Sequence, residues 1–229
     1  MEILVDTAKL EDIRWACDYY PISGVTCNPT IIRNSADPAD PFEHLRKMRE
    51  IVGFERTLHA QVISPDGEEM IREAHELVNR VDRDIYIKIP VTQEGLKAIT
   101  HLKQQGFHVT ATTVYDTMQA FYALAAGADY IAIYVNRMDT FAEKAENLYL
   151  AVQNKIEQES LPTRIMASGF HSAGQLKAAF RCGVETATIT PDILKASFSN
   201  QNVINHVASF QKDWESMYGE GATLLNAKR

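Results

Sequence analysis

The sequence predicts an α/β protein built as a single (β/α)8 TIM barrel with an extended C-terminal helix. Short β-branched apolar runs alternate with amphipathic stretches eight times over about 200 residues. No Pro/Gly-rich linker or change in composition divides the chain. A length of 229 residues, of which 45% are hydrophobic, is enough to bury one such core. A two-domain, doubly wound arrangement remains the alternative.

The first three units alternate strand and helix. Residues 3–7 form an apolar run that ends in a carboxylate, and residues 10–19 have the spacing of a short helix. Residues 24–29 begin as a strand and run into a loop. The next helix is expected over residues 41–52, because a proline suits its first turn. The third strand is residues 57–63, and its helix is indicated by apolar residues three and four apart: Met70, Ile71, Ala74, Leu77, Val78 and Val81.

The next three units follow the same pattern. Residues 85–92 are the fourth strand, which should end near Pro90, since proline cannot continue a sheet ladder. The helix after it has an apolar stripe at Leu96, Ile99 and Leu102 and ends at Gly106. A strand over 109–114, a helix over 115–126 and a strand over 130–135 come next. The sixth helix shows one apolar side, made of Phe141, Ala145, Leu148, Tyr149, Val152 and Ile156.

The last units complete the count of eight. Residues 164–168, 175–180 and 186–190 are the expected strand, helix and strand. The last helix is predicted by an apolar stripe that is longer than one helix needs to cover its strand. The stripe consists of Val203, Val207, Phe210, Trp214 and Met217. It predicts burial against another subunit or closure of the bottom of its own barrel, and the spacing does not choose between them. We expect residues 1–218 to form the barrel with its C-terminal helix, and residues 219–229 to form a tail.

Composition and motifs exclude several classes of function. A formal charge of −7 disfavours a nonspecific nucleic-acid or anionic-membrane surface. Cys17, Cys27 and Cys182 are an odd, widely spaced set, which indicates neither a disulfide framework nor a cysteine zinc site and fits a reducing cytoplasm. No window approaches the roughly 18 apolar residues of a membrane span. The sequence contains neither a His-Glu-x-x-His motif nor a dinucleotide fingerprint, so we expect no bound metal and no cofactor.

The fourth strand contains a lysine within an apolar run. Ile85, Ile87 and Ile89 take one face of this strand, while Tyr86 and Lys88 share the other. Lys88 lies near the carboxyl end, where α/β enzymes usually keep their chemistry. A lysine in a pocket loses hydration, which favours its neutral, nucleophilic amine and hence Schiff-base chemistry with a carbonyl. The ordinary alternative is a lysine on a solvated face.

Five polar residues lie near the ends of other strands, on the face that corresponds to that of Lys88 and opposite the aliphatic residues. They are Asp6, Asn28, Gln61, Thr112 and Tyr134. Every buried polar group needs a partner, so their convergence with Lys88 is easier to explain as a site than as a core. Asp6 would shuttle protons or orient the amine, and Tyr134 would take or deliver a proton directly or through a water held by Gln61 and Thr112. Asn28 would bind a substrate hydroxyl or carbonyl. Arg137, if it is not a surface salt-bridge residue, is the natural holder of a phosphate.

Several motifs resemble those of the transaldolase family, and most closely its small fructose-6-phosphate aldolase branch. They are Asp6-Thr7, residues 24–32 (GVTCNPTII), residues 87–96 (IKIPVTQEGL) and residues 134–137 (YVNR). These motifs occur in the same order as in the family, and the resemblance extends through residues 210–214. The resemblance implies a class I aldolase with a Schiff base at Lys88 and with Thr26 and Asn28 on the substrate side. It implies reversible cleavage of fructose 6-phosphate, or a similar ketose, to dihydroxyacetone and an aldehyde such as glyceraldehyde 3-phosphate. It also implies a homo-oligomer, a pentameric ring or decamer, in which the last helix reaches a neighbour.

Two comparisons within that family bear on the reaction. Transaldolases typically have Glu and Phe where this chain has Gln61 and Tyr134, which favours an aldolase over a transaldolase. Where the similar aldolases carry Ser and Lys around a phenylalanine, this chain has Gly169 and His171, which weakens the phosphate site next to Arg137. The Gly169 N–H could still bind an anion, and Thr110, often aliphatic in the family, makes the pocket more polar. A transaldolase and a noncatalytic sugar-binding barrel remain the alternatives.

Overall fold

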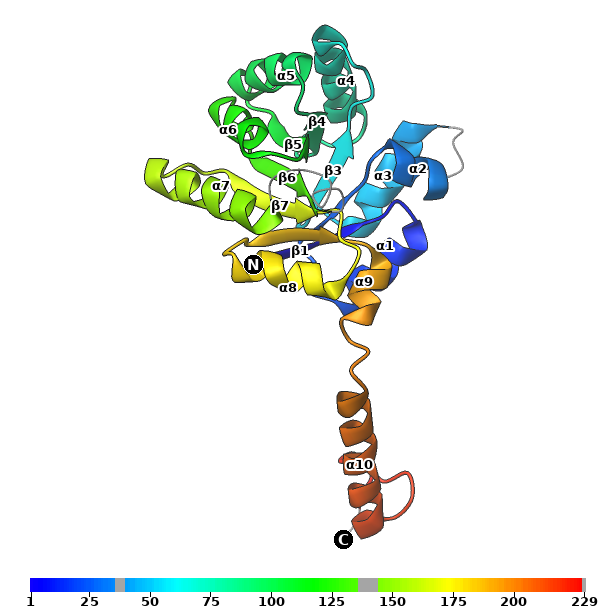
Figure 1. The fold of residues 1–229 in the computed structure, drawn as a ribbon. Helices are drawn as coiled ribbons and strands as arrows, with labels where there is room; N and C mark the ends of the chain where they lie inside the picture. Colours follow the sequence, from blue (N-terminus) through cyan, green and yellow to red (C-terminus); the bar gives the residue numbers. More distant parts are fainter. Residues whose placement is uncertain (36–39, 136–143, 228–229) are drawn as a thin grey trace. The chain divides into compact units, whose positions relative to one another are not determined.

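The computed structural model describes residues 1–35, 40–135 and 144–227. The chain divides into two compact units, Met1–Ile193 and Leu194–Arg229. In the first unit, parallel strands are hydrogen-bonded in sequence order and β8 pairs with β1, so the sheet closes on itself (Figure 1). The strands are β1 (Glu2–Asp6), β2 (Gly24–Thr26), β3 (Thr57–Gln61), β4 (Tyr86–Pro90), β5 (His108–Val114), β6 (Tyr130–Tyr134), β7 (Arg164–Ser168) and β8 (Thr186–Ile189). The predicted eight-stranded barrel is confirmed.

Helices follow the strands around the outside of this barrel (Figure 1). They are α1 (Leu10–Tyr19), α2 (Pro29–Ser35), α3 (Pro41–Val52), α4 (Gly67–Arg80), α5 (Gln93–Gln104), α6 (Thr117–Ala125), α7 (Ala145–Glu159), α8 (Ala173–Arg181) and α9 (Pro191–Ala196). The bounds predicted for α1 and α3 are confirmed. The first residues of the predicted sixth helix, including Phe141, lie outside the described residues.

The prediction of a loop after β2 is wrong in part, because residues 29–35 form α2. Asn28 precedes this helix and its Oδ1 accepts the N–H of Ile31 at 3.0 Å, as a helix-capping side chain does. Pro29 occupies the first turn, where a missing N–H costs nothing. Seven residues are too few to give a clear 3.6-residue periodicity, so the sequence pattern did not indicate the helix.

The alternation of side chains along each strand separates two layers. Inside the barrel, Leu4, Tyr130, Ala132 and Met166 form a buried cluster. On the opposite face of β4, Ile87 and Ile89 are fully buried, as is Ile85 just before the strand. Each β/α unit therefore buries one strand face against helices and turns the other inward.

The amino end of the barrel is closed by a polar cluster around Glu2. The Glu2 carboxylate accepts hydrogen bonds from Tyr130 Oη at 3.0 Å and from Thr186 Oγ1 at 2.9 Å, and it forms an ion pair with Arg164. These groups come from β1, β6, β8 and β7, so they join strands on both sides of the closing seam. Polar groups at this end stabilise the barrel, and the opposite, carboxyl end remains for chemistry.

The second unit consists mainly of α10 (Gln201–Tyr218). Along this helix, Val203, Val207, Phe210 and Met217 are each more than half exposed. Trp214, the remaining member of the predicted stripe, is partly buried and packs on Tyr218 with ring centroids 4.5 Å apart. An apolar stripe of this kind marks a surface that packs against something else. The division at residue 218 stays a prediction. Among the described helices, none is long and apolar enough to cross a membrane.

Candidate functional site at the carboxyl end of the barrel

The strand register brings the predicted site residues to one end of the barrel. Gln61 is the pairing partner of Lys88, and Thr112 is the partner of Pro90, two residues beyond the lysine. Asp6 and Tyr134 are the last residues of β1 and β6. Because all strands are parallel, their carboxyl ends meet at the same mouth. The structure therefore places the predicted residues of five strands at one end of the barrel.

Lys88 is buried at this mouth, with 2% of its surface exposed. It extends from the middle of β4, with Gln61 on one neighbouring strand and Thr110 on the other as its register partners. Its charge acts on Asp6 and on His59, which places all three groups within electrostatic reach of one another. Lys88 is thus a buried amine at the mouth with a carboxyl group within electrostatic reach, which is the kind of side chain that Schiff-base chemistry uses.

Asp6 is held by a chain of hydroxyl groups. Thr26 Oγ1 donates to Asp6 Oδ1 at 2.6 Å and lies 2.7 Å from Thr188 Oγ1. Because Thr26 gives its only hydroxyl proton to Asp6, Thr188 must be the donor to Thr26. Burial raises the pKa of Asp6 above its ordinary value, against smaller lowering effects from Lys88 and the Thr26 hydrogen bond. A carboxyl group with a raised pKa next to an amine is suited to proton transfer.

Thr112 and Tyr134 form a second pair across the mouth. Thr112 is fully buried, and its Oγ1 donates to Tyr134 Oη at 3.1 Å. The Tyr134 oxygen is thus the acceptor, which leaves its own proton for another group. The Tyr115 ring packs edge-on against Tyr134, with centroids 5.7 Å apart, and restricts where the phenol can lie.

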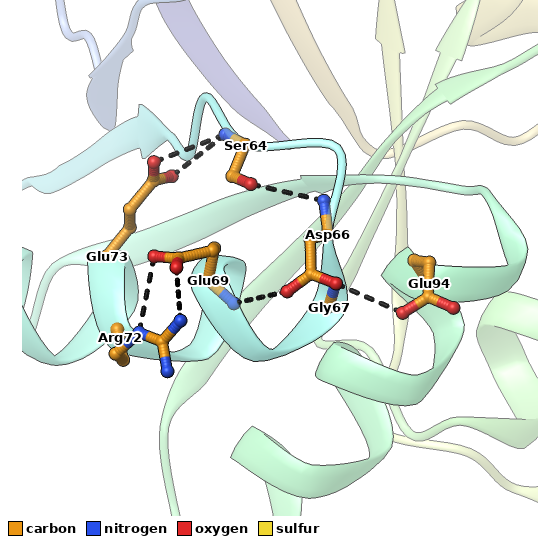
Figure 2. A network of polar contacts seen from close by, with 7 residues as sticks. All are labelled: Ser64, Asp66, Gly67, Glu69, Arg72, Glu73 and Glu94. Carbon is orange, nitrogen blue, oxygen red and sulfur yellow. Dashed lines mark hydrogen bonds and ion pairs between the residues drawn. The ribbon is translucent and has the colours of Figure 1, made fainter.

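The loop after Gln61 is tied to two helices (Figure 2). Glu73 of α4 accepts the N–H of Ser64 at 3.2 Å, and Glu94 of α5 accepts the N–H of Gly67 at 3.1 Å. A Cβ on Gly67 would come within 2.9 Å of the Glu94 carbonyl oxygen, so glycine is needed for this close approach. These contacts anchor the backbone just beyond β3, the strand that ends at Gln61.

His59, two residues before Gln61, is a buried group that the sequence analysis did not select. Its Nδ1 lies 2.8 Å from Thr110 Oγ1 and its Nε2 lies 2.9 Å from Thr57 Oγ1. Thr57 Oγ1 donates to the Ser23 carbonyl, so it accepts from Nε2–H, and Nδ1 in turn accepts from Thr110. The imidazole is stacked on Tyr86 with centroids 4.6 Å apart. The signal available in the sequence was its inward register, shared with Gln61.

His59 should make the stability of the protein depend on pH. Burial, reinforced by the charge of Lys88, holds the pKa of His59 well below 6.5 in the folded state. The unfolded chain then binds a proton that the folded chain does not, so stability present above pH 6.5 is lost as the pH falls. We expect the free energy of unfolding of the wild type, relative to His59→Phe, to fall by up to about 1.4 kcal/mol per pH unit below pH 6.5.

Urea unfolding of both proteins between pH 7 and pH 5 measures this difference, and the phenylalanine preserves a ring to stack on Tyr86. Contributions from the other histidines cancel in the comparison. A difference that does not change with pH would show that His59 titrates alike in both states.

The structure describes four of the five predicted substrate-binding residues. Asn28 is partly exposed at the start of α2, whereas Thr26 is fully buried and bonded to Asp6. Gly169 follows β7 with φ 72°, and His171 is exposed, with its N–H donating to Gln175 Oε1 at 2.8 Å. The hydroxyl of Ser168 donates to the Ile133 carbonyl at 3.0 Å. Arg137 lies outside the described residues.

The donor groups at the mouth do not form a metal site. Across residues 1–35, 40–135 and 144–227, no three His, Cys, Asp or Glu side chains are arranged to hold a metal ion. All three cysteines are free thiols.

Comparison with known proteins identifies a matching family and a relative of this chain. Residues 3–226 match the family model described as transaldolase/fructose-6-phosphate aldolase. The chain is also 35% identical over 214 residues to a protein of Streptococcus pneumoniae (strain ATCC 700669 / Spain 23F-1) named "probable fructose-6-phosphate aldolase". That similarity covers 93% of this chain and 96% of the relative, so it extends over the whole barrel.

Proposed function

Because the chain belongs to the transaldolase/fructose-6-phosphate aldolase family, we propose that it is a class I aldolase whose Lys88 forms a Schiff base with a small hydroxyketone. The observation that carries this proposal is the burial of Lys88 within electrostatic reach of the Asp6 carboxyl group. A desolvated amine supplies the nucleophile, and a carboxyl group with a raised pKa supplies and removes protons. Neither step requires a metal or a cofactor.

The reaction divides among the residues at the mouth. The neutral Lys88 amine adds to the ketose carbonyl, and loss of water, with protons passed through Asp6, leaves an iminium ion. The iminium withdraws electrons, so the bond between the third and fourth carbons breaks as the Asp6 carboxylate takes the proton of the hydroxyl on the fourth carbon, releasing an aldehyde and leaving an enamine on Lys88. Tyr134 gives a proton to the enamine carbon, and hydrolysis of the resulting iminium releases dihydroxyacetone and regenerates the amine.

The direction of the hydrogen bond to Tyr134 supports its role as proton donor. Thr112 donates to the phenol oxygen, so the phenol proton is available to the enamine. Gln61, the register partner of Lys88 at the end of β3, is suited to hold a water next to Lys88. A tyrosine here favours aldol cleavage with release of dihydroxyacetone over transfer to another aldehyde.

A transaldolase that moves a dihydroxyacetone unit between sugar phosphates is the second candidate. The two reactions share the Schiff base and differ in what becomes of the enamine. Release of free dihydroxyacetone from fructose 6-phosphate without any acceptor aldehyde would establish the aldolase. Product that forms only after an acceptor aldehyde is added would establish the transaldolase.

We propose fructose 6-phosphate, or a similar ketose, as the substrate. The amide of Asn28 would bind a substrate hydroxyl, and Thr26 would act on the same side through Asp6. At the phosphate end, Arg137 and the N–H of Gly169 are the proposed anion donors. The Ser168 hydroxyl is engaged by the Ile133 carbonyl, so it does not replace a phosphate-binding serine. His171 places an imidazole where an ammonium group would make a stronger anion site.

A weakened phosphate site predicts a limited preference between acceptors. We expect glyceraldehyde 3-phosphate to be used about tenfold better than glyceraldehyde, the effect of one charge-assisted hydrogen bond. Arg137→Met should remove this preference and leave the reaction with glyceraldehyde unchanged. Initial aldol rates with both aldehydes, in both proteins, measure it. Equal wild-type rates with the two aldehydes would mean that the pocket does not recognise phosphate.

We also propose that the protein is a cytoplasmic homo-oligomer, in the form of a pentameric ring or decamer. The exposed apolar stripe of α10, including Val207 and Phe210, supports packing against a neighbouring copy. Sedimentation velocity tests this directly, and a monomer at micromolar concentration would exclude it.

A further inference from the structure

Thr113 adopts an unfavourable backbone conformation inside a strand of the barrel. Its φ of 60° lies in the left-handed region, which a β-branched residue rarely enters. Among the described residues, Ser160 is the other non-glycine residue with a positive φ, and it caps the end of α7, where this conformation is common. Strain of this kind persists only where the surrounding structure requires it, and such residues cluster at functional sites.

The strain at Thr113 belongs to a β-bulge between β5 and β6. Ala111 pairs with Ile131 and Val114 pairs with Ile133, so three steps along β5 match two steps along β6. One extra residue is therefore inserted into β5. The insertion turns Val114 outward, where it is fully buried beside Ile133. In an unbulged strand, the two-residue period would direct Val114 into the mouth after Thr112.

The bulge also fixes Thr112 from two sides. The Thr112 carbonyl accepts the N–H of Val91 at 3.0 Å and the hydroxyl of Thr113 at 2.6 Å. With its carbonyl held, the Thr112 side chain is directed inward and donates to Tyr134 Oη at 3.1 Å. The Thr113 side chain thus anchors the backbone from which the bond to Tyr134 extends.

We propose that Thr113 is a positioning residue that sets how fast the enamine is protonated. Its left-handed bulge makes Thr112 the last inward side chain of β5 and keeps the Tyr134 oxygen as an acceptor, with the phenol proton free for the enamine carbon. This inference rests on the proposed aldolase function. Without the Thr113 hydroxyl, the Thr112 carbonyl keeps only the Val91 N–H as donor, so Thr112 holds the phenol less firmly, protonation slows, and the enamine survives long enough to react with an acceptor aldehyde.

Thr113→Gly tests the proposal, because glycine accepts a positive φ without strain and removes the anchoring hydroxyl. We expect an unfolding midpoint equal to or above that of the wild type. Release of free dihydroxyacetone should slow about tenfold, the effect of losing one neutral hydrogen bond of typical strength. Borohydride trapping of dihydroxyacetone on Lys88 and transfer to an added aldehyde should be retained. Thr113→Ser keeps the hydroxyl and should restore release to within about twofold of the wild type.

Ser160→Gly is the matched control, since it relieves the same kind of strain on the exposed end of α7. We expect its release rate to equal that of the wild type. The proposal is overturned if Thr113→Gly releases dihydroxyacetone at the wild-type rate, if Thr113→Ser is as slow as Thr113→Gly, or if Ser160→Gly slows release equally. Failure to trap dihydroxyacetone on the wild type would instead overturn the proposed Schiff-base function.

Discussion

Replacing Lys88 with methionine is expected to abolish aldol cleavage and synthesis, with a loss of roughly 10⁴-fold or more, because no other group supplies the amine for the Schiff base. Methionine has a similar volume and places an uncharged chain in a site that is only 2% exposed, so the barrel should stay folded. Borohydride reduction in the presence of dihydroxyacetone should add a covalent mass to the wild type at Lys88 and none to the variant. Intact-protein and peptide mass spectrometry measure both results.

The control for this experiment is Lys97→Met, which removes an exposed lysine of α5 that pairs with Glu68. It should keep both the activity and the adduct. An adduct that persists in Lys88→Met, or none on the wild type, would exclude the proposed mechanism. Activity that is lost on addition of a chelator would point to a metal-dependent reaction instead.

Tyr134→Phe should separate enamine formation from enamine protonation. The variant lacks the phenol proton, so release of free dihydroxyacetone from fructose 6-phosphate should fall by about 10²-fold, within the range of a single general acid. The Schiff base at Lys88 should still form and trap with borohydride. Because the enamine then waits for an acceptor, transfer to an added aldehyde should be retained, and the ratio of transfer to release should rise.

The measurement is the rate of free dihydroxyacetone release with and without acceptor aldehyde. Tyr122→Phe, at a residue of α6 that is 55% exposed, is the control and should behave like the wild type. Tyr134→Phe also leaves the Thr112 hydroxyl without its acceptor, at a cost of about 1 kcal/mol in stability. An unchanged release rate in Tyr134→Phe would assign the proton to another group, with a water at Gln61 as the first candidate.

Much of the fold could be predicted because it follows from local patterns. The two-residue period of β4 placed Lys88 opposite Ile87 and Ile89, and the structure confirms that these isoleucines are buried. Pro90 ends the strand as expected. Helix α2 was missed because seven residues around a proline carry too little periodicity to indicate a helix.

The candidate site was predictable to the extent that it depends on strand ends. Asp6, Gln61 and Tyr134 are each terminal residues of their strands, and a parallel barrel must gather such residues at one mouth. Their partners were not predictable in this way. A hydroxyl becomes a partner only when strand register brings it within hydrogen-bonding distance, and register depends on the whole barrel.

The sequence by itself therefore determined the eight β/α repeats, the inward position of Lys88 and the polar strand ends around it, since each follows from side-chain periodicity. Only the tertiary structure decided which groups meet. Closure of β8 onto β1 brings Thr188 to Thr26 and thus to Asp6. The pairing of β3 and β5 with opposite edges of β4 brings His59 to Thr110. The bulge at Thr113, which directs Thr112 to Tyr134, is defined only by the pairing of β5 with β6.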